Sequence, residues 1–527
     1  MRDEADQNPL ADRLHPCDVH VVAKPIRRDE LLATLPPEWP ASDLRARIQE
    51  STVASGRKIV VLDDDPTGAQ TVHDVPVVTQ WTPEILAAAW DEAGTTFYVL
   101  TNSRRYPLAE ATAMNGEIAR NLAQVARARG VNPVVVSRSD STLRGHYPGE
   151  VSALRQALED ELGICYDGIV IVPFFLEGGR VTIADTHWVQ EADQNPLADQ
   201  NPLADQNPFG EWLTPAAQTE FARDPTFGYN HSDLREWVAE KTEGRVPADA
   251  VLSVGLRDIR EGGPGVVTDL LAPVKDRRVI VVNAATYRDV EVFVWGLMQA
   301  ERQGRRFLFR TAASFVKVRG GIPDRGLLTY RELYPAGQDR DAGGLTIVGS
   351  YVQRTTEQLD AVLKLDDVLG LELCVAHVLD APRRAGEIDR AMSRAEKALR
   401  RGRDVVLYTS RELVIPEGMS HLQAGQRVSE ALVEIVRRLS IRPAYLIGKG
   451  GITSSDLATD GLGIRRAQVL GQILPGVPVW RMGPDSRYPR LPYVIFPGNV
   501  GGPDALARTI HILRGRVQNS ASRSKPL

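Results

Sequence analysis

The sequence predicts an α/β protein of two domains, each with a largely parallel sheet flanked by helices. Short apolar runs without alternation recur along the chain and are separated by helical patterns, which is typical of βαβ units in a parallel sheet. At 527 residues and 43% hydrophobic residues, the chain is also long enough for more than one core. A Gly-rich stretch of mixed charge, PAGQDRDAGG, divides the strand and helix series into two.

Composition and charge exclude several classes of protein. The 63 basic and 68 acidic residues are mixed and give a net charge of -5, so we expect neither nucleic acid nor a membrane as partner. Cys17, Cys165 and Cys374 lie far apart, which argues against a disulfide framework or a thiolate metal site and favours a cytoplasmic protein. The polar, acidic start predicts no signal peptide, and no apolar run approaches the ~18 residues of a membrane span.

The first 55 residues are predicted to form an N-terminal extension. Prolines surround Trp39, and one helix is expected from Ser42 to Ser55 with Ser42 as its N-cap. The segment EADQNPLAD at residues 4–12 recurs at 191–199, where it continues as three hexads through residue 209. Three short repeats with Asn-Pro steps are too few for a solenoid, so we predict an exposed, mobile insertion without a catalytic role.

The stretch KIVVLDDDPTGAQ, residues 58–70, combines a buried strand with an acidic turn. Its β-branched and bulky residues fit a strand that is covered on both faces. Asp63, Asp64 and Asp65 would then lie at the carboxyl end of that strand, where open α/β sheets bind their ligands. An ordinary acidic turn is the alternative, because Asp, Pro and Gly are common turn residues.

Further strand ends in the first half of the chain carry arginine. The predicted strands span residues 97–100, 133–136, 169–172 and 279–282, and the clearest helical patterns span 108–129 and 148–162. The arginines that follow three successive strands are Arg104, Arg138, Arg144 and Arg180. Surface charge is the commoner fate of arginine, but this recurrence indicates a pocket for a carboxylate or phosphate. His146, His187 and His231 lack metal-ligand spacing, so no metal ligand is assigned.

The second half of the chain has strand ends rich in Gly, Ser and Thr. Its predicted strands span residues 346–348, 405–408, 445–447 and 494–496. They are followed by Gly349-Ser350, Thr409-Ser410, the segment 448–456 and the segment 497–502. Small residues leave backbone N–H groups open to phosphate oxygens, so this half is interpreted as a nucleotide site. No standard phosphate-binding fingerprint is present, and the glycines alone are compatible with tight turns; Lys449 either faces a phosphate or is solvated.

Together these segments resemble a known family. Asp64-Asp65-Pro66-Thr67-Gly68-Ala69 is similar to the DD-x-T-G-A motif of the four-carbon acid sugar kinase family, once a domain of unknown function. The further matching elements are D-S-T-L-R-G at 140–145, Gly179-Arg180, Gly349-Ser350, G-G-I-T at 450–453 and P-G-N-V-G at 497–501. The likeness runs from about residue 56 to about residue 515 in the family's order. Ile452 stands where the family often has an acidic residue.

The resemblance implies an enzyme that phosphorylates a small acid sugar, such as a tetronate or 3-oxo-tetronate, with ATP and Mg²⁺ in the cleft between the domains. Catalysis is then assigned to Asp64 and Asp65, one of which orients and deprotonates the attacking hydroxyl. Substrate binding is assigned to Arg104, Arg138, Asp140, Ser141, Arg144 and Arg180. ATP binding is assigned to Ser350, Gly450, Gly451, Ile452, Thr453 and Gly498.

The expected organisation is an extension at 1–55, a sugar-acid-binding domain at 56–335, a linker at 336–344, a nucleotide-binding domain at 345–515 and a disordered tail at 516–527. A homo-oligomer is compatible with this organisation. Two other functions stay open. One is a non-catalytic sugar-acid sensor with a degenerate nucleotide site, suggested by Ile452. The other is an NAD-dependent dehydrogenase, although G-x-G-x-x-G is missing.

Overall fold

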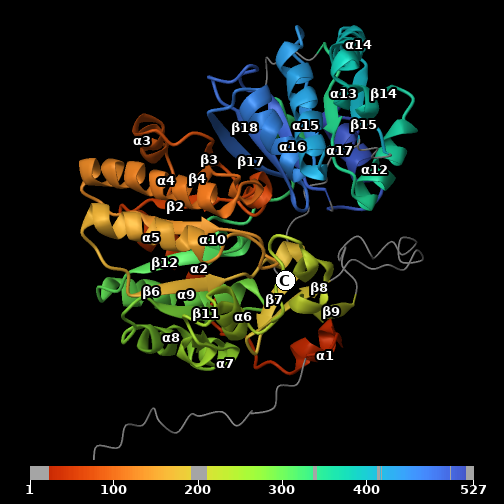
Figure 1. The fold of residues 1–527 in the computed structure, drawn as a ribbon. Helices are drawn as coiled ribbons and strands as arrows, with labels where there is room; N and C mark the ends of the chain where they lie inside the picture. Colours follow the sequence, from red (N-terminus) through yellow and green to blue (C-terminus); the bar gives the residue numbers. More distant parts are fainter. Residues whose placement is uncertain are drawn as a thin grey trace, which may run out of the picture.

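The computed structural model describes residues 23–190, 211–335, 341–411, 416, 418–498 and 500–517. The hexad insertion, most of the C-terminal tail, the start of the extension and residues 336–340 of the expected linker lie outside this part. Figure 1 shows two lobes, the N-terminal lobe in orange to green and the C-terminal lobe in teal to blue.

One 15-stranded sheet runs through both lobes. In spatial order its strands are β10 (Leu252–Val254), β11 (Arg278–Val282), β6 (Gly168–Val172), β12 (Phe307–Thr311), β5 (Val134–Arg138), β2 (Ile59–Asp63), β4 (Thr96–Leu100), β3 (Val75–Val78), β17 (Arg466–Leu474), β18 (Val477–Met482), β19 (Pro492–Phe496), β16 (Leu446–Lys449), β13 (Leu345–Val348), β15 (Asp404–Thr409) and β14 (Val368–Leu373). The eight strands from β10 to β3 are all parallel, as are the five from β19 to β14. The predicted fold class is therefore confirmed.

Helices cover both faces of this sheet. In the N-terminal lobe, one face carries α3 (Pro83–Asp91), α4 (Leu108–Arg129) and α5 (Gly149–Leu162), and the other carries α2 (Leu44–Ala54), α7 (Leu256–Arg260), α8 (Gly263–Leu271), α9 (Tyr287–Arg302) and α10 (Ala313–Arg319) (Figure 1). Val60 and Val61 point to opposite faces, and each is fully buried in a different core cluster. This double burial is why the strands lack hydrophobic alternation.

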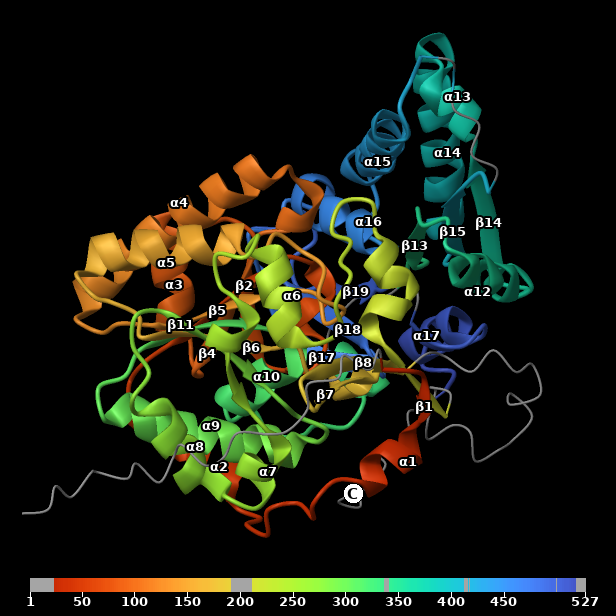
Figure 2. The ribbon, with the colours of Figure 1, turned by 60° about the horizontal axis from the view of Figure 1, so that its bottom comes forward.

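The C-terminal lobe repeats the same layering. Its helices are α12 (Gln353–Leu363), α13 (Val375–Leu379), α14 (Ala381–Leu399), α15 (His421–Arg438), α16 (Gly451–Asp456) and α17 (Ala505–Leu513). In Figure 2, α13, α14 and α15 lie on one side of the strands, with α12 and α17 toward the other side. Two further helices are α6 (Leu234–Lys241) and α11 (Tyr330–Leu333), and α11 contacts α17.

The sheet crosses from one lobe to the other through an antiparallel pair of strands. β3 pairs with β17, with Val77 opposite Ala467, and β17 continues into a hairpin with β18. Neither strand of this hairpin was predicted from the sequence, although Pro475-Gly476 between the strands is a turn signal. The pairing fixes the two lobes through backbone hydrogen bonds and leaves no free strand edge where they meet.

A second, four-stranded antiparallel sheet was not expected from the sequence. Its order is β1 (Ile26–Arg27), β9 (Trp212–Pro215), β8 (Thr186–Gln190) and β7 (Arg180–Ile183). β7 begins with Arg180, one of the predicted substrate-binding residues. The small sheet therefore lies where it positions that arginine beside the strand ends of the large sheet.

The N-terminal extension packs on the first lobe. Its helices are α1 (Arg28–Ala33) and α2, and α2 starts two residues later than expected. The predicted cap is wrong: Asp43 occupies the N-cap position, and no side chain caps the helix. Leu44 and Ile48 are buried in the core cluster that contains Val61, and this burial stabilises α2 in place of a cap.

A buried ion pair anchors this extension. Arg260 forms a bidentate pair with Asp289 (Nε–Oδ1 2.7 Å, Nη2–Oδ2 2.9 Å), and its Nη1 donates to the Pro36 carbonyl. Asp289→Ala is expected to lower the free energy of unfolding by about 3–5 kcal/mol, because a buried guanidinium then lacks its partner. Urea unfolding measures this loss. Asp43→Ala, which removes an exposed pair with Arg47, should cost less than about 1 kcal/mol. Equal losses in the two variants would contradict the prediction.

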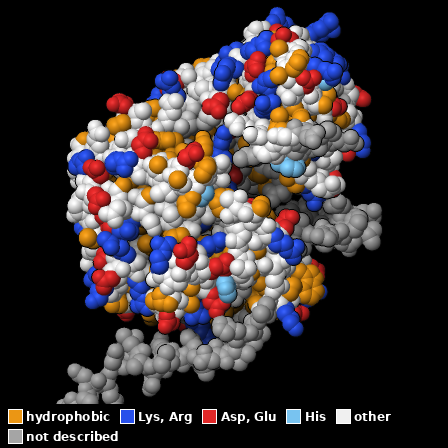
Figure 3. Space-filling view, in the orientation of Figure 1, with side chains coloured by type: hydrophobic (Ala, Val, Ile, Leu, Met, Phe, Trp, Pro, Cys, Tyr) orange, Lys and Arg blue, Asp and Glu red, His pale blue; other side chains and the backbone are white. Residues whose placement is uncertain are grey.

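Among the described residues, no helix is long and apolar enough to cross a membrane. Figure 3 shows basic and acidic side chains interspersed over the visible face, with a hollow where the two lobes meet.

Candidate active site between the two lobes

The acidic turn after β2 is built around Asp65. Its carboxylate caps the short 3₁₀ helix η1 (Pro66–Ala69) by accepting from the backbone N–H (2.8 Å) and hydroxyl (2.5 Å) of Thr67. Asp63 lies inside the turn, and a Cβ atom on Gly68 would overlap its carboxylate, so only glycine fits there. The three acids at the end of the predicted strand therefore lie in three different environments.

Asp64 is the acid with a buried carboxylate oxygen that lacks a hydrogen bond. Its side chain is 4% exposed, and Ser139 donates its hydroxyl to Oδ2 at 2.5 Å. Oδ1 is buried, has no hydrogen-bond partner within the described part of the chain and lies 3.8 Å from Nη1 of Arg138. Burial raises the pKa of Asp64 above its ordinary value, although Arg104 and Arg138 oppose the shift. A buried carboxylate with a raised pKa and an oxygen that lacks a hydrogen bond has the properties of a general base.

The other two acids differ from Asp64. Burial raises the pKa of Asp63 to about 7, although Arg138 lowers it. Burial also acts on Asp65, but there the charge of Arg104 and the bonds from Thr67 outweigh it and hold the pKa below the ordinary value. Asp65 is thus fixed as an anion.

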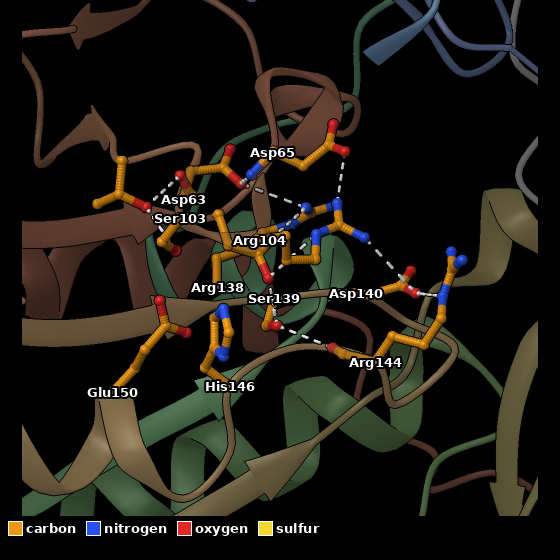
Figure 4. A network of polar contacts seen from close by, with 12 residues as sticks. Asp63, Asp65, Ser103, Arg104, Arg138, Ser139, Asp140, Arg144, His146 and Glu150 are labelled. Atoms are coloured by element: carbon orange, nitrogen blue, oxygen red, sulfur yellow. Dashed lines mark hydrogen bonds and ion pairs between the residues drawn. The ribbon is translucent and has the colours of Figure 1, made fainter. Parts of the chain in front are cut away.

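Three of the four predicted arginines are already paired with acids, as Figure 4 shows. Arg104 contacts Asp65 (2.5 Å), Asp64 (3.3 Å) and Asp140 (3.7 Å). Arg138 is buried behind the turn and pairs with Asp63 at 3.2 Å. Arg144 pairs with Asp140 at 2.6 Å and with Asp224 at 3.5 Å. Their charges are largely balanced within the protein.

Arg180 differs from these three arginines. Within the described residues its side chain forms no ion pair, and its Nε is buried without a hydrogen-bond partner. Its guanidinium lies 5.7 Å from the ring centre of Phe221, on which Arg144 also stacks. Burial lowers the pKa of Arg180 to about 10, so it remains a cation near neutral pH. A half-buried guanidinium without an acidic partner among the described residues favours an anionic ligand.

Ser141 is held mainly through its backbone. Its carbonyl accepts from Nε2 of the buried His187 at 2.7 Å, and burial lowers the pKa of that imidazole to about 4. The structure thus brings Asp140 into the arginine network but leaves the Ser141 hydroxyl outside it.

Sequence reasoning missed three residues of this network. Ser139 bonds to Asp64, and Arg310 on β12 donates to the Arg144 carbonyl at 3.1 Å. Burial raises the pKa of Glu150, on α5, to about 7, and Asp64 adds to the shift. Arg310 had a detectable signal, because it follows the apolar run Phe307–Phe309 as the other site arginines follow theirs. Glu150 had no such signal in the sequence, because its approach to Asp64 depends on how α5 packs.

The turns of the C-terminal lobe converge around Ser350. A Cβ atom on Gly450 would lie 3.1 Å from the Ser350 Cβ, and one on Gly498 would lie 3.4 Å from Ser350 Oγ. Gly450 has a φ of +109°, which favours glycine. Thr453 lies beneath Gly349, whereas Ile452 is 62% exposed. The predicted nucleotide residues are therefore adjacent to one another, and the Ile452 side chain points outward.

The two predicted halves of the site meet across the lobe boundary. A Cβ atom on Gly451 would lie 3.3 Å from Oδ2 of Asp65, so the acidic turn touches the glycine turn. Arg105 forms an ion pair with Asp456 of α16, which also accepts from Ser429. Asp456 is therefore engaged in an interlobe contact. Among the described residues, no group of three or more His, Cys, Asp or Glu side chains is arranged to hold a metal ion.

This fold and site define a two-domain α/β protein with an acid and arginine pocket on one lobe and glycine turns on the other. A family model described as "Sugar-binding N-terminal domain" matches residues 59–319, and one described as "Nucleotide-binding C-terminal domain" matches residues 345–506. The chain belongs to the four-carbon acid sugar kinase family. The predicted family is confirmed.

Curated relatives are similar over most of the chain. D-threonate kinase from Salmonella typhimurium is 24% identical over 393 residues, covering 72% of this chain and 81% of the relative. D-erythronate kinase from Heliobacterium modesticaldum is 25% identical over 429 residues, covering 78% and 80%. 3-Oxo-isoapionate kinase from Paraburkholderia graminis is 25% identical over 302 residues, covering 53% and 60%. These relatives support a kinase of this family.

Solved structures share the fold at low identity. A Haemophilus influenzae protein of the same former family of unknown function aligns with a TM-score of 0.57 at 17% identity, covering 86% of this chain and all of that one. A Salmonella typhimurium protein described as a putative tRNA synthase aligns with a TM-score of 0.60 at 17% identity, covering 86% and 98%. At such identity the likeness shows the fold alone.

Proposed function

We propose that this protein transfers the γ-phosphate of ATP to a hydroxyl group of a small, four-carbon acid sugar such as a tetronate or 3-oxo-tetronate. The observation that carries the proposal is the contact between Asp65 and Gly451, which joins the acid and arginine pocket to the glycine turns. Phosphoryl transfer requires alignment of an acceptor hydroxyl with a bound phosphate, and this junction supplies both sides. The names of the curated relatives support the substrate class.

In the proposed reaction, Arg180 binds the substrate carboxylate, and Arg104 and Asp140 lie within reach of its hydroxyls. Asp64 accepts the proton of the attacking hydroxyl at its carboxylate, whose Oδ1 is buried without a hydrogen bond. The hydroxyl oxygen forms a bond to the γ-phosphorus, the bond from that phosphorus to the β–γ bridging oxygen breaks, and ADP leaves. Arg104 holds Asp64 and Asp65 in place and adds positive charge where the phosphate charge shifts.

On the nucleotide side, Ser350 and the turns at Gly450–Thr453 and Gly498 form the proposed phosphate cradle. Their small side chains leave the backbone open to phosphate oxygens. Mg²⁺ is the expected companion of ATP, but the described acids do not form a metal site of three or more ligands. The ion would be held chiefly by phosphate oxygens and water, so no step is assigned to it.

The proposal is tested by incubating the purified protein with ATP, Mg²⁺ and a panel of four-carbon acids. ADP release is followed in a coupled assay, and phosphorus NMR identifies the product. We expect one acid to give stoichiometric ADP and phosphorylated acid. Binding of an acid, seen as a raised melting temperature, without ADP release from any member would favour the sensor. Turnover only with NAD would favour the dehydrogenase.

A further inference from the structure

Lys449 is a fully buried lysine beside the glycine turns. It ends β16, and its side chain is 0% exposed. Lysine is almost never fully buried unless its charge is paired. Among the described residues, no carboxylate lies within ion-pair distance of Lys449. Instead, its Nζ donates to the carbonyl oxygens of Pro497 and Gly498 (3.0 Å for Gly498) and lies 4.4 Å from the ring centre of Phe496.

The bond from Lys449 orients the turn that follows β19. A trans peptide unit is planar, with its C=O and N–H pointing in opposite directions. Because the Pro497 carbonyl points at the Lys449 ammonium, the N–H of Gly498 points away from it. Within the described chain, no acceptor is found for this N–H group. Gly498 in turn lies beside Ser350, at the predicted phosphate cradle.

Two neighbouring side chains also donate hydrogen bonds to carbonyl oxygens of this turn. Thr355 donates its hydroxyl to the Gly498 carbonyl at 2.9 Å. Gln358 donates its Nε2 to the carbonyls of residues 500, 501 and 502, at 2.9 to 3.2 Å. The carbonyl oxygens of residues 497, 498, 500, 501 and 502 are therefore all hydrogen-bonded by side chains. Such an arrangement leaves the opposite side for N–H groups, which is the requirement for an anion.

We propose that Lys449 is the positioning residue of the nucleotide site: its ammonium group fixes the Pro497–Gly498 turn with N–H groups facing the ATP phosphates and places a positive charge behind them. This inference rests on the proposed kinase function. The charge polarises the peptide units toward the phosphate, and the phosphate compensates a buried cation that otherwise has only neutral partners. Neither Gly498 nor Ser350 carries charge, so Lys449 supplies it.

The surroundings of Lys449 make its charge sensitive to the ligand. Burial, and to a lesser extent Arg354 on α12, lower its pKa to about 7. The other ionisable groups on the packed elements are engaged elsewhere: Glu357 with Arg354, Asp456 with Arg105, and the Tyr493 hydroxyl with the Ser454 carbonyl. A bound polyphosphate raises the pKa of Lys449, so nucleotide affinity should be full below pH ~7 and fall as the pH rises above it.

Lys449→Met and Lys449→Gln test the proposal in the full chain. Methionine removes both charge and donors, whereas glutamine keeps N–H donors without charge. We expect ADP binding, measured by calorimetry at pH 7, to weaken roughly 10- to 100-fold in the methionine variant and less in the glutamine variant. Sugar-acid affinity should stay unchanged, which shows that the N-terminal lobe is intact. Lys397→Met, on the exposed face of α14, is the matched control and should bind ADP normally.

A second measurement decides the matter if the methionine variant does not fold. ADP titrations at pH 8, in buffers of different ionisation enthalpy, count the protons taken up on binding; at this pH the phosphates themselves are already ionised. The wild-type protein should take up a substantial fraction of a proton, and Lys449→Gln should not. ADP binding by Lys449→Met within threefold of wild type, or equal proton uptake by wild type and Lys449→Gln, would overturn the proposal. Failure of the wild type to bind ADP would instead overturn the kinase function itself.

Discussion

Asp64→Asn should reduce kcat by at least ~100-fold while leaving the KM for ATP nearly unchanged, because positioned general bases contribute about 10²- to 10⁴-fold. Asparagine preserves the shape of the side chain and its bond from Ser139 but cannot accept the hydroxyl proton. Steady-state kinetics with the accepted acid measures the effect. Circular dichroism establishes that the variant is folded.

The pH profile gives an independent check on Asp64. The base must be ionised, so kcat should fall as the pH falls through its pKa. Burial raises this pKa, so the acid limb should lie above the value of about 3.9 that is ordinary for aspartate. In Asp64→Asn this limb should disappear from the residual activity.

Two neighbouring substitutions serve as matched controls for Asp64. Asp63→Asn should retain kcat within about tenfold, because the Asp63 carboxylate contacts Arg138 and lies against Gly68 inside the turn. Asp65→Asn weakens the cap on Thr67 and the contact with Arg104, so it should disturb substrate positioning more than proton transfer. A drop in kcat confined to Asp65→Asn, with Asp64→Asn fully active, would show that Asp65 is the base and Asp64 the positioning residue.

Arg180→Met should raise the KM for the acid sugar roughly 100-fold or more. Loss of one partner from a buried, hydrogen-bonded charge pair costs about 2–5 kcal/mol, and each 1.4 kcal/mol is tenfold. Methionine retains much of the side-chain volume over Phe221. The KM for ATP should change little, because Arg180 lies in the N-terminal lobe.

A neutral substrate analogue identifies the group that Arg180 binds. The amide of the accepted acid should be a far poorer substrate for the wild-type protein, whereas Arg180→Met should distinguish acid from amide only weakly. Arg223→Met, an exposed arginine in the same region, should behave as wild type. Equal discrimination by wild type and Arg180→Met would show that another group receives the carboxylate.

Local pattern was sufficient to predict much of the fold. The uniform apolar runs gave β2, β5 and β6 nearly to the residue, because burial on both faces removes any alternation. The helix at residues 108–129 was predicted with its observed bounds. The hairpin of β17 and β18 was missed although its turn residues, Pro475-Gly476, are a local signal. The pairing of β17 with β3 and of β9 with β1 joins segments distant in sequence, so a local pattern does not predict it.

The family, the two strand series and the acidic turn at Asp63-Asp64-Asp65 were predictable from the sequence, since they depend on neighbouring residues and fixed motif spacing. The distribution of the charges is visible only in the folded chain. Within the described chain, Arg180 has no acidic partner, Asp64 Oδ1 is buried without a hydrogen bond, and Lys449 is buried beneath the Gly498 turn. Ion pairing and desolvation depend on distances between groups far apart along the chain, and a linear pattern does not contain those distances.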